Sequence, residues 1–171
     1  MTENLKVVLF TSRNKDNKDV PGFKQRSKTF LTTKDKDDKT LIDEFENWSE
    51  QGLSGETSRF YISVNSRDSD KINKAFVHYL LNNPQISPAS YPQRVASVAA
   101  KKENASEFKW LFDFDEKKEL ITEFISDIKK ESNLTDEEIE FSETVTGFAV
   151  IVKHGFDTRN IIKKWKNVEL K

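Results

Sequence analysis

Cysteine is absent from the 171 residues of this sequence, which excludes disulfide bonds, thiol catalysis and cysteine-based zinc or iron–sulfur sites. Imidazole is scarce too, because the chain has only two histidines, His78 and His154. His78 stands beside an apolar stripe on a predicted helix and is interpreted as structural. His154 follows a predicted strand and is interpreted as a surface residue rather than a metal ligand.

Long hydrophobic runs are missing as well. No stretch approaches the length of a membrane span, and Met1 to Phe10 lacks the apolar core of a signal peptide. Neither sign of charge is in surplus, since 28 basic and 29 acidic residues give a net charge of −1. The protein therefore has no overall basic field that attracts nucleic acid, and such a contact would need a local patch. We expect a cytoplasmic protein with no membrane partner and no disulfide partner.

What the chain does contain is a set of large apolar residues that recur periodically. Hydrophobic residues make up 35% of the chain and charged residues 33%, and the apolar set includes 13 Phe and 3 Trp. This composition and periodicity favour a folded globule over a disordered chain. The length suffices for one domain or for two small sub-domains that share a core, and we expect one compact body.

Three segments follow from the pattern of the chain. Residues 1–84 predict an N-terminal α/β unit of three strands and two helices. Prolines 84, 88 and 92 punctuate the start of residues 85–107, which are interpreted as a connector followed by a helix. Residues 108–171 form the third segment, which has the most regular pattern.

The third segment predicts six elements in the order strand, helix, strand, strand, helix, strand. They are expected at residues 109–115, 120–128, 139–143, 147–153, 161–165 and 168–170. With right-handed crossovers, the first and third strands of such a βαββαβ unit are antiparallel neighbours. We therefore predict an α+β fold, in which an RRM-like or ferredoxin-like C-terminal unit packs with a smaller N-terminal α/β unit.

The first strand of this unit carries two aspartates, Asp113 and Asp115. Because side chains alternate along a strand, the large apolar residues Trp110, Phe112 and Phe114 should face the helices, and the two aspartates should lie together on the open face. Carboxylates about 7 Å apart suit a site for Mg²⁺ or Mn²⁺, in which they are candidate metal ligands and catalytic residues. The alternative is that Asp115 caps the next helix and Asp113 is merely solvated.

Further charged residues are candidates for contacts with the metal or with phosphates. Asp157 is either a third metal ligand or a helix cap. Lys153 lies on the open face of its strand, and Arg159 stands in the first turn of the next helix. Lys101 and Lys102 precede the acidic strand, where they meet phosphates or simply form a solvated helix end. Arg59, from the N-terminal half, is a further candidate for gripping phosphates.

These residues carry a resemblance to a known family. The stretch Trp110-Leu-Phe-Asp-Phe-Asp115 resembles the first metal motif of the archaeo-eukaryotic primase (primase-polymerase) superfamily. The stretch 144–152 resembles the second motif in form, but Gly147 stands where serine is usual and Ala149 where the phosphate-contacting histidine is usual. Asp157 corresponds to the third, acidic motif. The resemblance implies a divalent-metal site for nucleotides, and residues 146–157 also resemble small proteins of tailed phages.

Three hypotheses follow. The first is a small, phage-type, primase-like protein that binds nucleotide or nucleic acid ends through the carboxylate pair with Mg²⁺ or Mn²⁺, in the host cytoplasm. Because a histidine that steadies phosphates is missing, catalysis is not expected. The second is a non-enzymatic protein that uses a degenerate primase fold to bind a host factor or a defence protein. The third is an active metal-dependent nucleotidyltransferase or nuclease, which needs a third ligand.

Overall fold

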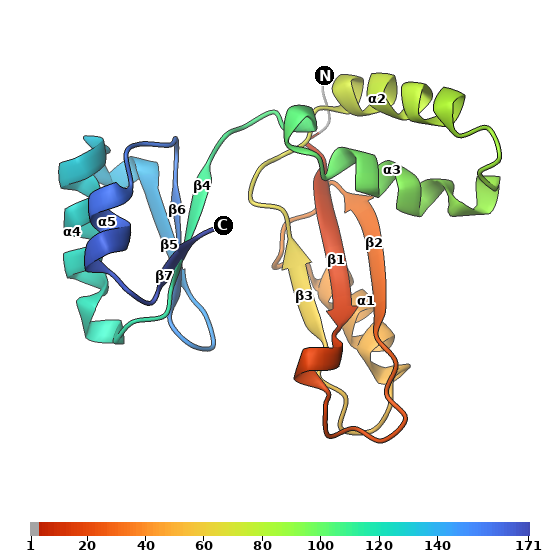
Figure 1. Cartoon of the computed structure of the whole chain (residues 1–171), viewed down its shortest axis with the longest axis horizontal. Coiled ribbons are helices and arrows are strands. Elements are labelled where there is room, and N and C mark those ends of the chain that lie inside the picture. Colours follow the sequence, from red (N-terminus) through yellow and green to blue (C-terminus); the bar gives the residue numbers. More distant parts are fainter. Residues whose placement is uncertain (1–3) are drawn as a thin grey trace. The chain divides into compact units, whose positions relative to one another are not determined.

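The computed structural model of the chain describes residues 4–171 (Figure 1). Its class is α+β, as predicted, with two antiparallel sheets and five α-helices in that range. The chain forms two compact units, which meet in sequence between Glu107 and Phe108. Residues 85–107 fold with the first unit, so this unit is the larger one, which corrects the prediction of a smaller N-terminal unit. That the two units form one body stays a prediction.

The first unit contains three strands and three helices, and the second unit contains four strands and two helices. The strands are β1 (Lys6–Ser12), β2 (Arg26–Thr32), β3 (Arg59–Ile62), β4 (Trp110–Phe114), β5 (Ile139–Glu143), β6 (Phe148–Val152) and β7 (Val168–Leu170). The helices are α1 (Lys39–Glu50), α2 (Ser69–Asn82), α3 (Tyr91–Ala99), α4 (Ile121–Ser132) and α5 (Arg159–Lys164).

The first sheet has the order β2-β1-β3, with both pairs antiparallel. Its central strand β1 is apolar on both faces, and helices cover it from both sides. On one face, Val8 and Phe10 are fully buried with Leu41 of α1. Phe10 is surrounded by four further rings, whose centroids lie 5.2–5.9 Å away, from Phe30, Phe45, Trp48 and Phe60. This aromatic cluster fixes α1 on the sheet.

The other face of the first sheet is covered by α2 and α3 at the start of β1. Val7 packs there with Ile72 of α2 and Ala99 of α3. α2 begins where the Asp68 carboxylate accepts hydrogen bonds from the backbone N–H groups of Asp70 and Lys71, each at 3.0 Å. This cap satisfies donors that the first turn of a helix leaves unpaired.

The second sheet has the order β5-β6-β4-β7, and every pair is antiparallel. The elements follow one another as strand, helix, strand, strand, helix, strand, in the predicted order. The neighbouring, antiparallel placement of β4 and β6 is confirmed. Figure 1 shows α4 and α5 on the same side of this sheet. Its other side is therefore a face without a helix of this unit.

Alternation along β4 decides which side chains reach that face. Phe112 and Phe114 are 0% exposed and pack with Phe124 of α4 and Trp165 at the end of α5. The side chains that alternate with these rings along β4, Leu111 and Asp113, consequently point to the opposite, open face. The predicted facing of this strand is confirmed by the burial of the two rings.

We predict that Phe112→Ala will lower the free energy of unfolding by roughly 3–5 kcal/mol, because it empties the space of a fully buried ring. Leu111→Ala, one position along on the open face, is the matched control and should cost clearly less. Denaturant unfolding of both variants measures the difference. Equal losses for the two variants would contradict the facing of β4.

Candidate functional site

Asp113 lies on the open face near one end of β4, between the neighbouring strands β6 and β7. Its Cα partners are Ala149 on β6 and Glu169 on β7. The Asp113 side chain is 38% exposed, and its Oδ2 lies 3.6 Å from the Nζ of Lys171. Lys171 also forms an ion pair with Glu169, and the hydrogen bond to Glu169, helped by the charge of Asp113, raises the pKa of Lys171. Asp113 is thus accessible, and an ammonium group balances part of its charge.

Asp115 follows the end of β4 and is exposed. Its Oδ1 accepts a hydrogen bond of 2.6 Å from the Thr146 hydroxyl, in the turn between β5 and β6. Its backbone N–H donates to the carbonyl oxygen of Asn167, at 2.9 Å. The next helical turn starts at Lys118 and α4 only at Ile121, so Asp115 caps neither of them. Its carboxylate is held beside the strand end instead.

The rest of the open face has an apolar centre with charged ends. Leu111, Ala149 and Ile151 are half-buried side by side on β4 and β6. At the end away from the aspartates lies a shallow hollow lined by Lys109, Glu137, Glu138, Glu140, Ile151 and Lys153. There the Lys153 ammonium lies 3.0 Å from Glu138 Oε1. Lys153 is on the open face as predicted, but it occupies this far end.

Asp157 and Arg159 lie away from the aspartate pair. Because β4 and β6 are antiparallel, with Trp110 opposite Val152 and Phe114 opposite Phe148, the chain that follows β6 leaves at the Trp110 end. Asp157 therefore lies beyond the end of β4 opposite to Asp115. It accepts hydrogen bonds from the backbone N–H and the guanidinium of Arg159, at 3.1 and 2.9 Å. These hydrogen bonds lower the pKa of Asp157 to about 2, and the bond from the guanidinium has the larger effect.

The remaining predicted phosphate contacts are in the first unit. Arg59 on β3 donates two hydrogen bonds of 2.9 Å to the carboxylate of Asp16. The hydrogen bonding between these two side chains raises the pKa of Arg59 and lowers the pKa of Asp16. Lys101 and Lys102 are exposed after α3. These three residues belong to the first unit, which ends at Glu107, whereas Asp113 and Asp115 belong to the second unit.

Asp113 and Asp115 are the two carboxylates at this end of β4, and Glu169 of β7 lies beside Asp113 in an ion pair with Lys171. Within residues 4–171, no group of three or more Asp, Glu, His or Cys side chains gathers in a metal-binding arrangement. A pair of carboxylates nevertheless fits Mg²⁺ or Mn²⁺ when substrate phosphates and waters supply the other ligands. The donor set therefore suits a cation that arrives with a phosphorylated ligand better than a cation held by the protein alone.

The sequence reasoning missed the contribution of β7 and of the β5–β6 turn. Glu169 and Lys171 flank Asp113 on one side, and Thr146 holds Asp115 on the other. The signal for the first two was weak, because β7 spans only Val168–Leu170, which is too short to show a period. Gly147, at the position where the resembling motif has serine, is required by packing. A Cβ there would lie 1.9 Å from the Phe114 carbonyl oxygen.

Comparisons with protein-family models, with curated proteins and with solved structures found no match for this chain. No helix in the described range has both the length and the apolar character needed to cross a bilayer.

We predict that the double variant Asp113→Asn with Asp115→Asn will change the free energy of unfolding by less than about 1 kcal/mol, because both groups are accessible and make exposed contacts. A matched control is Asp127→Asn, since Asp127 Oδ2 accepts hydrogen bonds from Trp165 Nε1 at 3.0 Å and Lys164 Nζ at 2.6 Å. Thermal and denaturant unfolding without metal measure both. A larger loss for the double variant than for the control would show that the pair is structural.

We predict that the Asp157 carboxylate titrates near pH 2, below its ordinary value of 3.8. Because the pKa is lower in the folded than in the unfolded chain, the contact with Arg159 favours folding above pH 3.8, and this contribution disappears as the pH falls toward 2. NMR titration of the side-chain carboxyl carbons measures it. Arg159→Gln should return the pKa toward 3.8, and an unshifted Asp157 in the unmodified protein would contradict the pairing.

Proposed function

We propose that the second unit is a primase-like nucleotide-binding unit without polymerase activity. Asp113 and Asp115 bind Mg²⁺ or Mn²⁺ together with the phosphates of a nucleotide or of a nucleic acid end, in the cytoplasm of a phage-infected cell. The observation that carries this proposal is the position of the pair. Both carboxylates are accessible at one end of the central strand β4, and Asp113 lies on the face without a helix.

The topology of the second unit supports the assignment of a ferredoxin-like or RRM-like fold. The strand order β5-β6-β4-β7, with α4 and α5 on one side, is the order expected of a βαββαβ unit with right-handed crossovers. Such a unit leaves one sheet face open for ligands. The resemblance to the primase superfamily places its metal motif on the first strand of this unit, which corresponds to β4.

The contacts of Asp113 explain how the pair formed by Asp113 and Asp115 can accept a cation in place of the Lys171 ammonium. Without one, the Lys171 ammonium lies 3.6 Å from Asp113 and also pairs with Glu169. Lys171 is 47% exposed in its side chain, so it can turn away at little cost. A divalent cation supplies concentrated positive charge between carboxylates and phosphates. Lys171 then remains close enough to meet a phosphate oxygen.

The absence of polymerase activity follows from the neighbours of Asp113. The Cα partner of Asp113 on β6 is Ala149, where the resembling motif has a histidine that contacts the incoming phosphates. Removing one charge-stabilising donor from an active site typically costs 10²–10³ in rate. Asp157 does not supply a third carboxylate, because the antiparallel pairing of β4 and β6 puts it at the other end of the sheet.

A second candidate function is favoured by the apolar centre of the open face. Leu111, Ala149 and Ile151 form a half-buried apolar strip there, with charged groups at both ends. Such a surface suits a protein that covers it better than it suits a polyphosphate. In this reading the unit is the non-enzymatic interaction protein, a binder of a host factor or defence protein. The metal-binding experiment separates the two functions.

We predict that the full chain binds Mn²⁺ more tightly in the presence of ATP than in its absence, as measured by calorimetry. Asp113→Asn should weaken this ATP-linked binding roughly tenfold or more, because it removes a charged ligand of the cation. Asp157→Asn is the matched control on the same unit and should bind as the unmodified chain does. Primer extension with Mg²⁺ or Mn²⁺ should yield no product.

Each result has a distinct reading. Equal Mn²⁺ binding by the unmodified chain and the Asp113 variant would overturn the metal site and favour the interaction protein. Nucleotide incorporation that depends on Asp113 would contradict the loss of catalysis while preserving the site.

A further inference from the structure

The first unit has a long sheet edge without a partner strand. β2 pairs with β1 along all seven of its residues, and the order β2-β1-β3 leaves its other side as an edge. No backbone hydrogen bond to another segment engages residues 27–32 on that side in the described part of the chain. The other edge strands are shorter, with three to five residues in β3, β5 and β7. A regular edge of this length is a template for strand addition.

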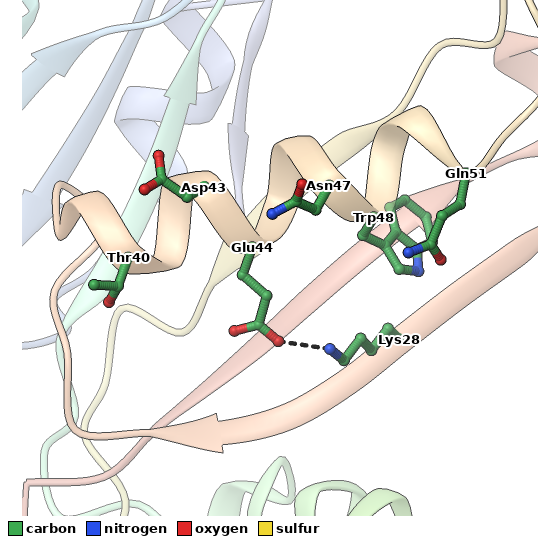
Figure 2. A pocket seen from close by; sticks show the side chains of 7 residues that line it. All are labelled: Lys28, Thr40, Asp43, Glu44, Asn47, Trp48 and Gln51. Carbon is green, nitrogen blue, oxygen red and sulfur yellow. Dashed lines mark hydrogen bonds and ion pairs between the residues drawn. The ribbon is translucent and has the colours of Figure 1, made fainter.

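A groove runs beside this edge. Figure 2 shows α1 along one side of it and β2 along the other, with Lys28 of β2 reaching toward Glu44 of α1. Its cavity volume is about 430 Å³, and it is lined by Lys28, Thr40, Asp43, Glu44, Asn47, Trp48 and Gln51. The lining residues of α1 recur at intervals of three and four, so they share one face of the helix. The polar side of α1 therefore forms one wall of the groove.

The α1 wall of the groove is acidic. Asp43 and Glu44 are the carboxylates of α1 that line the groove, whereas the other two carboxylates of the helix, Glu46 and Glu50, lie outside its lining. Glu44 pairs with Lys28 at 2.5 Å, and both side chains are more than 40% exposed. Asp43 lines the groove with no side-chain hydrogen bond or ion pair to residues 4–171. The wall thus has negative charge that the chain itself leaves unbalanced.

One end of the groove is fixed before any ligand arrives. The guanidinium of Arg26, the first residue of β2, lies 3.9 Å from the ring centroid of Trp48 and donates to the carbonyl oxygens of Trp48 and Ser49, at 2.8 and 3.1 Å. It also pairs with Glu56 at 2.7 Å, and the Glu56 side chain is only 3% exposed. The last turn of α1 and the start of β2 are therefore held together, which lowers the ordering cost of binding.

We propose that this groove binds an extended, basic segment of a partner protein, which adds to β2 as a fourth strand. The backbone of the segment pairs with the free peptide groups of β2. Lysine or arginine side chains at alternate positions of the segment reach the α1 wall, where Asp43 and Glu44 receive them. In this binding mode, hydrogen bonds between the two main chains supply the affinity, and the carboxylates of the α1 wall select for positively charged side chains. This site is separate from the carboxylate pair of the second unit.

Charge also argues against a second copy of the chain as the occupant. Pairing of two β2 edges about a two-fold axis brings the same surface of both copies together. The two acidic α1 walls would then lie close to each other, and like charges across an interface are unfavourable. A basic segment meets the opposite situation, since its charge faces the carboxylate of Asp43, which lines the groove.

The test uses the full chain and a synthetic peptide of alternating lysine and valine, with a peptide of alternating glutamate and valine as its control. Hydrogen exchange followed by NMR reads the amides of residues 27–32. The lysine peptide should slow exchange at alternate β2 amides roughly tenfold, and the glutamate peptide should not. Asp43→Lys should weaken binding roughly three- to fivefold, whereas Glu46→Lys, which makes the same charge change on α1 outside the groove lining, should have little effect.

Several results would overturn the proposal. One is the absence of protection on β2 at millimolar lysine peptide, and another is an equal effect of the Asp43 and Glu46 variants, which would indicate general electrostatic attraction. Concentration-dependent protection of β2 without any peptide, together with a dimer in sedimentation, would assign the edge to a second copy of the chain instead. Metal binding at Asp113 should be unchanged throughout, so failure here is distinguishable from failure of the proposed function.

Discussion

The burial of Phe112 and Phe114 is the constraint on which the second unit depends. Each ring is fully buried among Phe124, Trp165 and their neighbours, and burying one such side chain contributes about 1.5–3 kcal/mol. Because side chains alternate along β4, this burial leaves Asp113 only the opposite face. The position of Asp113 is thus a consequence of packing on the other side of the sheet, and Asp115 is held beside the strand end by the Thr146 hydroxyl. The repulsion between two exposed carboxylates is small beside the apolar gain.

Much of this arrangement could be predicted from sequence because its signal is strong and local. Alternating large apolar residues identify β4 and its facing, and the order of elements predicts the antiparallel contact with β6. The antiparallel pairing of β4 and β6 already implied that Asp157 lies at the opposite end of the sheet from Asp115. The assignment of Asp157 as a third metal ligand, which followed the order of the motifs, overlooked this consequence. The ion pair between Asp113 and Lys171 could not be predicted from the sequence, because β7 has only three residues, too few to show a periodic pattern.

The first unit was less predictable for a physical reason. Residues 85–107 have the prolines of a connector, yet Ala96, Val98 and Ala99 of α3 are buried, so this segment completes the core of the first unit. Small side chains give little hydrophobic signal in a sequence, although they allow a helix to approach a sheet closely. Strand order has no local signal at all. That β2 is an edge, and that Arg26 joins it to α1, became visible only with the fold.

The central claim is that the open face of the second sheet gathers a divalent cation at Asp113 and Asp115. Crystals of the full chain grown with Mn²⁺ and ATP test it most directly, because anomalous scattering locates manganese without assumptions about its ligands. The account predicts a peak within about 2.5 Å of carboxylate oxygens of both residues, with phosphate oxygens completing its coordination. A peak at the far hollow near Glu138 and Glu140, or no peak bonded to Asp113, would contradict it.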